Sequence, residues 1–402
     1  MGIALALELK RRHPDLAVTL IEKEPGCGRH ASGRNSGVLH AGFYYSADSL
    51  KAQFTGAGNR QLAAYCEARG LRLVRCGKLV VARTAADLPA LTELLRRART
   101  NGVPLEVLSA DEARQIEPRA RTCERALYSP STAVVDPGEV VASLVGDLRA
   151  AGVAVLTGTA YLGRRGAEIR TSTGAISAGY VINAAGLYAD RIARDFGFSE
   201  RYRIVPFRGG YLRAGPETPG FRTHIYPAPD LRYPFLGVHI IRTVAGGAKI
   251  GPTATPAFWR EHYEGWDRFS LAECLTILRV ELGLVVRNNC GFRRLAVREL
   301  LRSNRRALLL AAQGLAAGIR AADFRASGTP GIRAQLVDLR NRTLEMDFRS
   351  EGDDRSFHLL NAVSPAFTCA LPFSAYLVDR IEELVGSRRA PQPDDQAAAH
   401  RP

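Results

Sequence analysis

The sequence is informative first through patterns that it lacks. Its seven cysteines form no CxxC pair, and its eight histidines show no HxxH or HxxxH spacing. These absences argue against a zinc site and a disulfide framework, so we predict no metal site and expect reduced thiols in a cytosolic compartment. No run of about 18 uncharged apolar residues occurs, so the sequence predicts no membrane-spanning helix.

Acidic residues are also in short supply. The chain of 402 residues has 55 lysines and arginines against 40 aspartates and glutamates, a formal net charge of +15. An arginine-rich composition accounts for this balance, although basic proteins also attract nucleic acids, anionic membranes or acidic substrates. The basic residues form no sustained run and no recognition module is visible, so we predict no nucleic-acid partner. An acidic substrate and a peripheral membrane contact stay open.

The first 22 residues predict the second half of a dinucleotide-binding unit. Residues 3–9 are typical of a buried helix, and residues 17–21 predict a buried strand that ends at Glu22. A complete unit is a strand, G-x-G-x-x-G, a helix and an acid about 20 residues further on. Gly2 fits the third glycine, and Glu22 fits the acid that binds the ribose hydroxyls of an adenosine. The strand and the first two glycines would precede Met1.

Helix and strand patterns alternate again later in the chain. The predicted elements are a helix at 140–150, a strand at 153–156, a strand at 180–186 that runs into a glycine turn, a helix at 188–196, a strand at 357–362 and a helix at 374–385. The polar, Pro/Ala-rich tail at 386–402 predicts disorder.

A loop of unusual composition lies between residues 30 and 45. It reads HASGRNSGVLHAGFYY, with three glycines and two histidines. Such residues suit a loop that brings its backbone close to a planar ligand. The loop resembles a segment beside the flavin ring in the L-2-hydroxyglutarate oxidase/dehydrogenase branch of the FAD-dependent oxidoreductases of the D-amino-acid-oxidase type. We interpret His40 as functional, whereas His30 fits a structural role equally well.

Further segments carry the same resemblance, which covers residues 1–288 and 329–385. They are 71–83, 181–190, 206–211, 225–230, 234–239, 331–335 and 361–366. Residues 289–327 have little family signature and predict a basic amphipathic helical region. We interpret it as a divergent surface helix pair, with a membrane- or quinone-facing surface as the alternative.

The resemblance implies an α/β fold with two interleaved domains. We predict a Rossmann-like FAD-binding domain, with its first strand missing, at residues 1–80, 136–205 and 328–386. An α+β substrate domain built on an antiparallel sheet would occupy 81–135 and 206–327, and a disordered tail would follow at 387–402.

The resemblance also implies FAD as the cofactor. The implied cofactor-binding residues are Gly2, Glu22, Lys23, Arg34, Asn35, Ser36, Gly37, Ala160, Ala185, Gly186, Gly331, Ser364, Pro365 and Ala366. Pro365 and Ala366 would open a helix whose N-terminus faces the electron-rich pyrimidine end of the flavin.

The implied reaction is oxidation of L-2-hydroxyglutarate, or a similar 2-hydroxy acid, by hydride transfer to flavin N5, with a quinone or oxygen as the final acceptor. A histidine suits the base because its pKa lies near working pH, and arginine suits a carboxylate. We expect His40 or His239 to be the base and Arg208 to hold a carboxylate, unless Arg208 is a structural ion-pair partner. The expected substrate-binding residues are Tyr44, Tyr226 and Arg333.

Two alternatives remain open from the sequence. One is an amine, amino-acid or glycerol-3-phosphate oxidoreductase of the same fold. The other is an inactive product, because a missing central strand leaves backbone groups unpaired and removes amides that cradle a pyrophosphate. We therefore expect these 402 residues to bind FAD weakly, fold poorly, or both.

Overall fold

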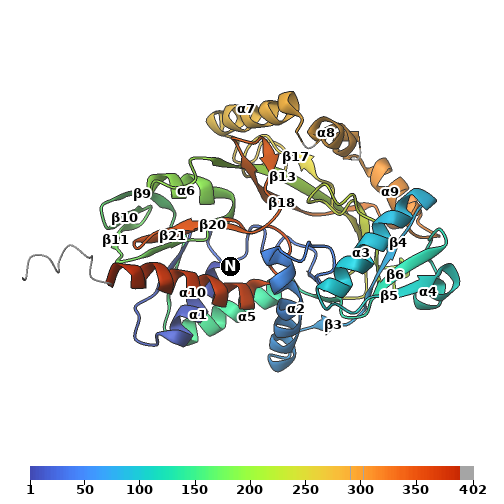
Figure 1. Ribbon diagram of the computed structural model, residues 1–402, viewed down its shortest axis with the longest axis horizontal. Coiled ribbons are helices and arrows are strands. Elements are labelled where there is room, and N and C mark those ends of the chain that lie inside the picture. The colour runs from blue at the N-terminus through green and yellow to red at the C-terminus, as the bar shows by residue number, and fades with distance from the viewer. Residues whose placement is uncertain (290, 302, 390–402) are drawn as a thin grey trace, which may run out of the picture.

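The largest sheet has ten strands and runs through the right-hand part of Figure 1. The computed structural model describes residues 1–289, 291–301 and 303–389. In spatial order the strands are β19 (Thr343–Leu344), β18 (Ala326–Asp338), β13 (Tyr202–Arg213), β16 (Ala248–Gly251), β15 (His239–Arg242), β14 (His224–Pro227), β4 (Lys78–Val81), β6 (Arg125–Ser129) and β5 (Glu106–Ser109), with β17 (Thr255–Pro256) beside β13. Neighbours are antiparallel except β14 and β4, as the antiparallel substrate domain predicts.

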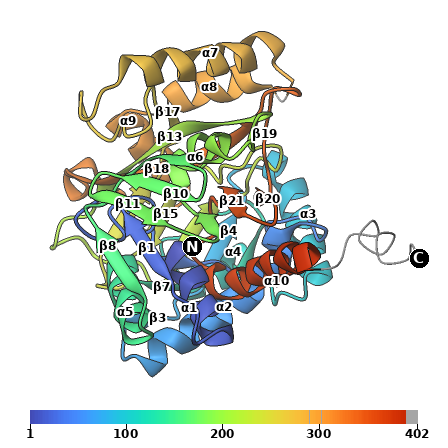
Figure 2. The same cartoon turned by 90° about the vertical axis from the view of Figure 1, so that its left-hand side faces the viewer.

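The apolar faces of amphipathic helices cover this sheet, because its strands point buried side chains alternately to its two faces. Its helices are α3 (Leu88–Thr100), α4 (Ala110–Ile116), α7 (Leu271–Arg287), α8 (Phe292–Leu301) and α9 (Arg305–Gln313), with 3-10 turns η1 (Ala85–Asp87) and η3 (Ala321–Asp323). Helix α9 packs on β15 and β16, and α7 packs on β13. Figures 1 and 2 show α7 and α8 side by side at the outer edge of the molecule.

The second region contains the nucleotide-type elements. Strand β1 (Thr19–Glu22) pairs in parallel with β8 (Ala154–Thr157), and β12 (Val181–Asn183) pairs in parallel with β21 (Ser356–Asn361). Strand β20 (Arg349–Gly352) extends the second group. The helices of this region are α1 (Gly2–Arg12), α2 (Leu50–Ala68), α5 (Pro137–Ala150), α6 (Ala189–Asp195) and α10 (Ala370–Arg389), with η2 (Gly186–Tyr188) before α6. Helix α1 packs against α5 and α10 (Figure 2).

Two small antiparallel sheets complete the fold. Strands β2 (Val38–Leu39), β7 (Ala133–Val135) and β3 (Leu73–Val74) form one, with β7 in the middle. Strands β9 (Tyr161–Arg165), β10 (Glu168–Thr171) and β11 (Gly174–Ser177) form the other. The first sheet joins the loop at residues 30–45, which contains β2 and precedes α2, to β3, which precedes β4 of the ten-stranded sheet.

The two halves of the nucleotide-type sheet do not pair with each other. In the described residues β1 has only β8 as a partner, and β12 has only β21 and no second neighbour. Leu20 and Ile21 of β1 line the same cavity as residues 181–184. A gap about as wide as one strand thus separates β1 from β12. A continuous parallel sheet would have one more strand at this place.

This gap corrects one sequence expectation. The strand at residues 17–21 was expected to be buried, but Thr19 is exposed and residues 20–22 are only half-buried. One edge of β1 opens on the cavity, and therefore apolar side chains that a neighbouring strand would cover stay accessible.

The other predicted elements are confirmed within a few residues. Helices α1 and α5 and strands β8, β12 and β21 lie where the sequence patterns place them. Two local expectations were wrong. Pro365 and Ala366 lie in turns before α10, which begins at Ala370, and residues 386–389 continue α10 instead of starting a disordered tail. The rest of the predicted tail, 390–402, lies outside the described residues.

The domain boundaries stay a prediction, and two long strands bear on them. Strand β13 starts four residues before 206, the first residue of the predicted substrate-domain segment, and β18 starts two residues before 328 and runs to Asp338. These two strands pair along almost their full length near the β19 edge of the ten-stranded sheet. Among the described helices, none is long and apolar enough to cross a bilayer.

Candidate active site

A cavity of about 1910 Å³ lies between the two regions and extends into the gap beside β1. It exceeds the roughly 300–1,000 Å³ of ordinary small-molecule pockets. Its wall includes the start of α1, the end of β1, the loop at 27–36, residues 181–188, the strands β13, β15 and β18, and the turn before α10. The cavity therefore has room for a large extended cofactor together with a substrate.

Thirteen of the fourteen predicted cofactor-binding residues line this cavity. They are Gly2, Glu22, Lys23, Arg34, Asn35, Ser36, Ala160, Ala185, Gly186, Gly331, Ser364, Pro365 and Ala366. Gly37 does not line the cavity and has a structural role in the loop instead. Its φ is +79°, and a Cβ there would lie 2.2 Å from the carbonyl oxygen of Val135. Gly37 therefore allows the loop to turn back against β7.

The loop at residues 27–37 is held in shape by its own polar groups. The Asn35 side-chain amide donates to the carbonyls of Ala31 and Ser32, and its oxygen accepts from the Gly37 amide. Arg34 donates to the carbonyls of Arg29 and Pro330. These bonds fix Asn35 in the loop and tie it to β18, so its backbone lies along the cavity wall.

The nucleotide end of the cavity fits FAD in part. Helix α1 begins at Gly2 with no side-chain cap, so amides of its first turn can meet an anionic group. Glu22 ends β1 at the cavity, the position of a ribose-binding acid. Gly2 lies at the position predicted for the third glycine of G-x-G-x-x-G.

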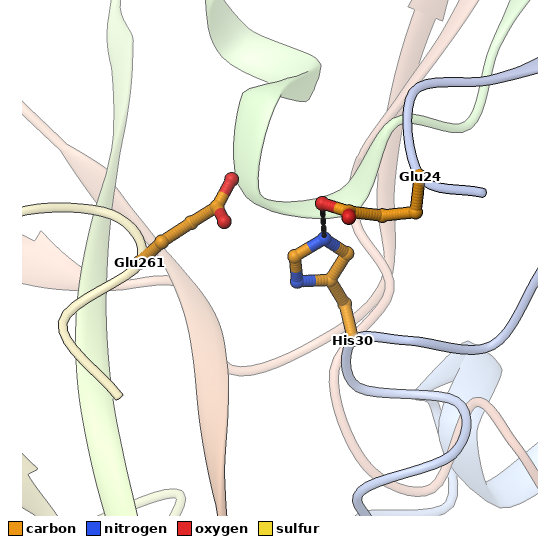
Figure 3. A group of neighbouring side chains, drawn as sticks. All are labelled: Glu24, His30 and Glu261. Atoms are coloured by element: carbon orange, nitrogen blue, oxygen red, sulfur yellow. Dashed lines mark hydrogen bonds and ion pairs between the residues drawn. The ribbon is translucent and has the colours of Figure 1, made fainter. Parts of the chain in front are cut away.

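A charged cluster stands beside this end of the cavity. Figure 3 shows the carboxylates of Glu24 and Glu261 on either side of His30, with one Glu24 oxygen 2.9 Å from His30 Nε2. His30 Nδ1 lies 2.7 Å from the Tyr263 hydroxyl. The side chains of Glu24, His30 and Glu261 are close enough to one another to hold a metal ion. Cationic side chains, however, already balance the charges of the two carboxylates.

Two cations bridge the carboxylates of this cluster. Lys23 Nζ lies 2.6 Å from both Glu24 and Glu261, and Arg268 also lies 2.6 Å from both. The Arg268 hydrogen bond, assisted by Lys23, holds the pKa of Glu24 well below its usual range. A metal ion would have to displace these cations, so the geometry favours a structural role for His30. Lys23 lines the cavity, but its ammonium group is paired with the two carboxylates of the cluster.

His239 is the better oriented of the two candidate bases. It lies at the start of β15, and its Nδ1 is 2.8 Å from the carbonyl oxygen of Gly237. A carbonyl can only accept, so Nδ1 carries the proton in the neutral ring and Nε2 keeps a free lone pair. The ring stacks on Tyr226 at 3.7 Å. Burial lowers the pKa of His239 to about 3, so the ring is neutral at pH 7.

His40 also lines the cavity, at the end of β2. Its ring Nδ1 is buried without a hydrogen-bond partner in the described part of the chain, and burial, with Lys78 as the next cause, lowers its pKa well below the ordinary value. The structure therefore brings both predicted histidines to one cavity in neutral form, from segments about 200 residues apart.

The arginine prediction needs correction. In the β13–β18 pair Phe207 lies opposite Arg333, and Arg208 lies opposite Ile332. Directly paired residues share a face, and successive residues alternate, so Arg208 and Arg333 point to opposite faces. Arg333 lines the cavity and Arg208 does not. Because of this register, Arg208 is poorly placed to hold a substrate carboxylate.

Arg333 is itself well placed for that role. One of its guanidinium nitrogens donates to the Pro234 carbonyl at 3.0 Å, and the group lies over the Phe235 ring. Burial lowers its pKa from the ordinary value, but arginine keeps its charge in proteins. A partly desolvated cation at the cavity wall favours binding of an anion.

Tyr226 lines the cavity, whereas Tyr44 lies behind the wall. Both rings are buried, and the Tyr44 hydroxyl has no hydrogen-bond partner among the described residues. Burial raises the pKa of both phenols well above the ordinary value, so they act as neutral donors. The predicted contact of Tyr44 with substrate stays a prediction.

Sequence reasoning missed Lys78. Its Nζ is fully buried and has no hydrogen-bond partner among residues 1–289, 291–301 and 303–389. It lies 4.3 Å from the centre of the Tyr226 ring and 5.2 Å from that of Tyr44. Burial lowers its pKa to about 7. Strand β4 lies next to β14, which lies next to β15, so the Tyr226 ring stands between Lys78 and His239. The available signal was a lysine opening the apolar run KLVV.

Comparison with known proteins agrees with this geometry. The profile of the FAD dependent oxidoreductase family matches residues 1–301. The chain is 34% identical to L-2-hydroxyglutarate dehydrogenase of Escherichia coli K12, over 97% of this chain and 93% of that protein. It is 35% identical to the mitochondrial L-2-hydroxyglutarate dehydrogenase of Homo sapiens, over 95% and 87%.

Solved structures support the fold. An L-alpha-glycerophosphate oxidase from Mycoplasma pneumoniae with FAD bound has a TM-score of 0.72 at 18% identity, over 95% of this chain and 92% of that one. Glycine oxidase from Geobacillus kaustophilus has a TM-score of 0.71 at 21% identity, with the same coverage. From the profile match and the similarity over nearly the full length, the chain belongs to the family of FAD-dependent oxidoreductases.

Proposed function

We propose that this chain oxidises L-2-hydroxyglutarate to 2-oxoglutarate. The observation that carries the proposal is the convergence of one cation, Arg333, and two neutral histidines, His40 and His239, on one cavity wall. A 2-hydroxy acid needs a proton acceptor for its hydroxyl and a cation for its carboxylate. The names of the relatives at 34–35% identity support the choice of substrate.

In this proposal His239 removes the hydroxyl proton through Nε2. Its Nδ1–H stays bonded to Gly237, which fixes both the tautomer and the ring plane. The imidazole becomes an imidazolium, and the electron pair of the breaking C2–H bond leaves as a hydride while the C2=O bond forms. FAD, when bound, supplies the hydride acceptor.

Arg333 holds one carboxylate of the substrate, and His40 lies beside the reacting carbon. Tyr226 supports the His239 ring from below by stacking. Lys78 contributes a positive potential behind Tyr226 that favours a dianionic substrate. Its charge also helps to lower the pKa values of His40 and His239, so that both histidines stay neutral before the reaction. Lys78 acts through these groups and is a positioning residue.

The residues for FAD follow from the cavity wall. Glu22 would bind ribose hydroxyls, the first-turn amides of α1 would meet phosphate, and Gly331 and the turn at 364–366 would approach the ring. A Cβ at position 331 would lie 2.8 Å from the Arg34 carbonyl oxygen, so only glycine lets β18 pass this close to the loop.

The electron acceptor and the location are also proposals. We propose that a quinone or oxygen reoxidises the reduced flavin. We also propose that the protein lies in the cytoplasm and contacts the inner face of the membrane. Reoxidation of the reduced protein by dissolved oxygen and by a water-soluble quinone, compared at equal concentration, distinguishes the two acceptors.

Anaerobic flavin reduction tests the substrate. The protein is saturated with FAD and mixed with L-2-hydroxyglutarate, its D enantiomer, glycine or glycerol 3-phosphate, and loss of visible flavin absorbance is followed. Fast bleaching by L-2-hydroxyglutarate alone is expected. Faster bleaching by glycine or glycerol 3-phosphate would transfer the assignment to the amine or phosphate oxidoreductases of this fold.

A further inference from the structure

A second cavity lies outside the proposed active site, where α6 and α7 both pack on β13. Its volume of about 270 Å³ is close to the lower end of the roughly 300–1,000 Å³ of small-molecule pockets. Guanidinium groups from three separate segments of the chain meet at its wall, although like charges repel one another. The four side chains are those of Arg191, Arg194, Arg203 and Arg260.

Two carboxylates pair with three of these arginines. Asp190 is fully buried and lies 2.8 Å from Arg260 and 3.4 Å from Arg194. Glu273 lies 3.0 Å from Arg191. Within the described parts of the chain, no third carboxylate forms an ion pair with the four arginines. Four guanidinium groups thus meet two carboxylates, which leaves two positive charges at the cavity wall.

Arg203 is the arginine that has no carboxylate partner among the described residues. Its Nη1 donates to the main-chain carbonyls of Ser199, Glu200 and Tyr202. Its Nε and Nη2 form no hydrogen bond within residues 1–289, 291–301 and 303–389. Burial lowers the pKa of Arg203, and the positive charge of Arg194 lowers it further, but arginine keeps its proton in proteins. The cavity is therefore electropositive and has unused donors.

The amino end of α7 borders the same cavity. Ser270 is the N-cap of this helix of 17 residues, and Ser270 and Ala272 both line the cavity. The first-turn amides of a helix carry a partial positive charge, which adds to that of the arginines. Ile204, Ile277 and Val280 form an apolar part of the wall. The cavity therefore suits a ligand with an anionic group and a small carbon part.

We propose that this cavity, here called the phosphate pocket, binds the phosphate group of a small metabolite. A phosphate monoester carries a charge of about −1.5 to −2 at pH 7, which matches the two positive charges that the carboxylates leave. Its three free oxygens accept hydrogen bonds from several guanidinium groups at once, whereas a carboxylate offers two oxygens. This inference goes beyond the proposed oxidation and needs neither its substrate nor its base.

The phosphate pocket adjoins the wall of the larger cavity. Arg191 lines both cavities. Arg260 donates to the carbonyl of Leu187, and residues 186–188 of η2 line the larger cavity. A phosphate held by Arg191 and Arg260 would therefore act directly on the segment that faces the cofactor.

Calorimetric titration of the FAD-saturated protein tests the proposal. Because FAD occupies the larger cavity, added phosphate reports on other sites. Inorganic phosphate and methyl phosphate are titrated separately, and acetate at equal ionic strength is the control for charge alone. We expect one site per chain that binds methyl phosphate at least tenfold more tightly than acetate. The absence of saturable binding, or equal affinity for acetate, overturns the proposal.

The two phosphates distinguish a metabolite from the free ion. Methyl phosphate should bind at least as tightly as inorganic phosphate, since its methyl group can meet the apolar part of the wall. A clear preference for inorganic phosphate would limit the pocket to the free ion and overturn the assignment to a metabolite.

A carboxylate placed in the pocket provides the sharpest variant. Thr276 lines the pocket, and its side chain is exposed on α7, so Thr276→Glu keeps all four arginines and spares the core. We expect it to weaken binding of methyl phosphate by about tenfold or more, because like charges repel. Thr276→Gln, which has the same shape without the charge, is the matched control and should bind like the wild type. Wild-type affinity in Thr276→Glu would contradict the proposal.

Arginine variants locate the bound phosphate independently. Arg203→Gln should weaken binding about tenfold, the effect of one lost charge-assisted hydrogen bond. Arg170→Gln removes the same charge from an exposed position on β10 and should bind like the wild type, as should Arg333→Met in the larger cavity. A loss in Arg333→Met as large as that in Arg203→Gln would place the phosphate in the larger cavity and overturn the proposal. Unfolding temperatures verify folding of each variant.

Discussion

The ten-stranded sheet and the nucleotide-type sheet differ in how completely their inner edges are paired. In the first, every strand between β19 and β5 has a partner on both sides. In the second, β1 and β12 each have one open edge, and both edges border the same cavity. Parallel strands depend on cover from both sides, so the second region has less to hold it together.

This difference coincides with the division of the active site. The groups that we propose for substrate, His239, Tyr226 and Arg333, stand on strands of the continuous sheet. The groups that we propose for the adenosine and phosphates, Glu22 and Gly2, stand beside the gap. We propose separate roles for the two parts: the continuous sheet positions the groups for substrate, and the residues beside the gap bind the nucleotide end of FAD. The predictions below separate the two.

The largest expected effect concerns the gap. An N-terminal extension that supplies an apolar strand and a G-x-G turn before Gly2 should raise the affinity for FAD by roughly 10²-fold, because two or more amides would bond a charged phosphate. Equilibrium dialysis with free FAD measures this. An extension of equal length with polar residues is the control, and an equal gain from both would show that the gap does not limit FAD binding.

The base is the next test. His239→Asn should slow anaerobic flavin reduction by about 10²-fold or more, because it removes the proton acceptor and leaves a smaller, neutral polar side chain. His40→Asn should have a smaller effect. Full wild-type rates in the double variant would exclude both histidines, and a larger loss in His40→Asn would reverse their order.

The two arginines provide a matched pair on adjacent positions of facing strands. Arg333→Met should raise KM for L-2-hydroxyglutarate by about 10- to 10²-fold, the effect of one lost charge-assisted carboxylate contact. Arg208→Met should change KM less than about twofold, since Arg208 faces away from the cavity. Steady-state kinetics with both variants decides. Equal effects would contradict the face assignment.

Lys78 should show the smallest effect on rate and a visible effect on pH dependence. Below pH about 7 its ammonium is charged and lowers the pKa values of His40 and His239. Lys78→Met removes that charge, so the acid limb of kcat/KM should move to higher pH by about one unit, while Lys78→Arg should leave it near the wild type. The profiles should converge above pH 7, where Lys78 loses its proton.

Stability supplies a second measurement on Lys78. Its pKa is lowered in the folded state, so the unfolded chain binds more protons between about pH 7 and 10, and the wild type gains stability as pH rises through that range. Lys78→Met should stabilise the protein by about 1–3 kcal/mol at pH 6, because an unpaired buried amine is replaced. Destabilisation there would indicate an unrecognised partner for Nζ.

Local patterns were sufficient for most of the fold. The alternation of apolar residues placed α1, α5, β12 and β21, and the loop at 30–45 was recognised from its glycines. The failures depended on tertiary structure. The half-burial of β1 depends on its one unpaired edge in the described residues, and the choice between Arg208 and Arg333 depends on strand register. The role of Lys78 depends on rings contributed by strands that are distant in sequence.

One measurement tests the central claim most directly: the rate of anaerobic flavin reduction by L-2-hydroxyglutarate as free FAD is raised. The account predicts that reduction rises with FAD occupancy to a fast plateau, and that His239→Asn lowers this plateau about 10²-fold at unchanged FAD occupancy. A chain that is saturated with FAD and still leaves its flavin oxidised in the presence of this substrate would contradict the account.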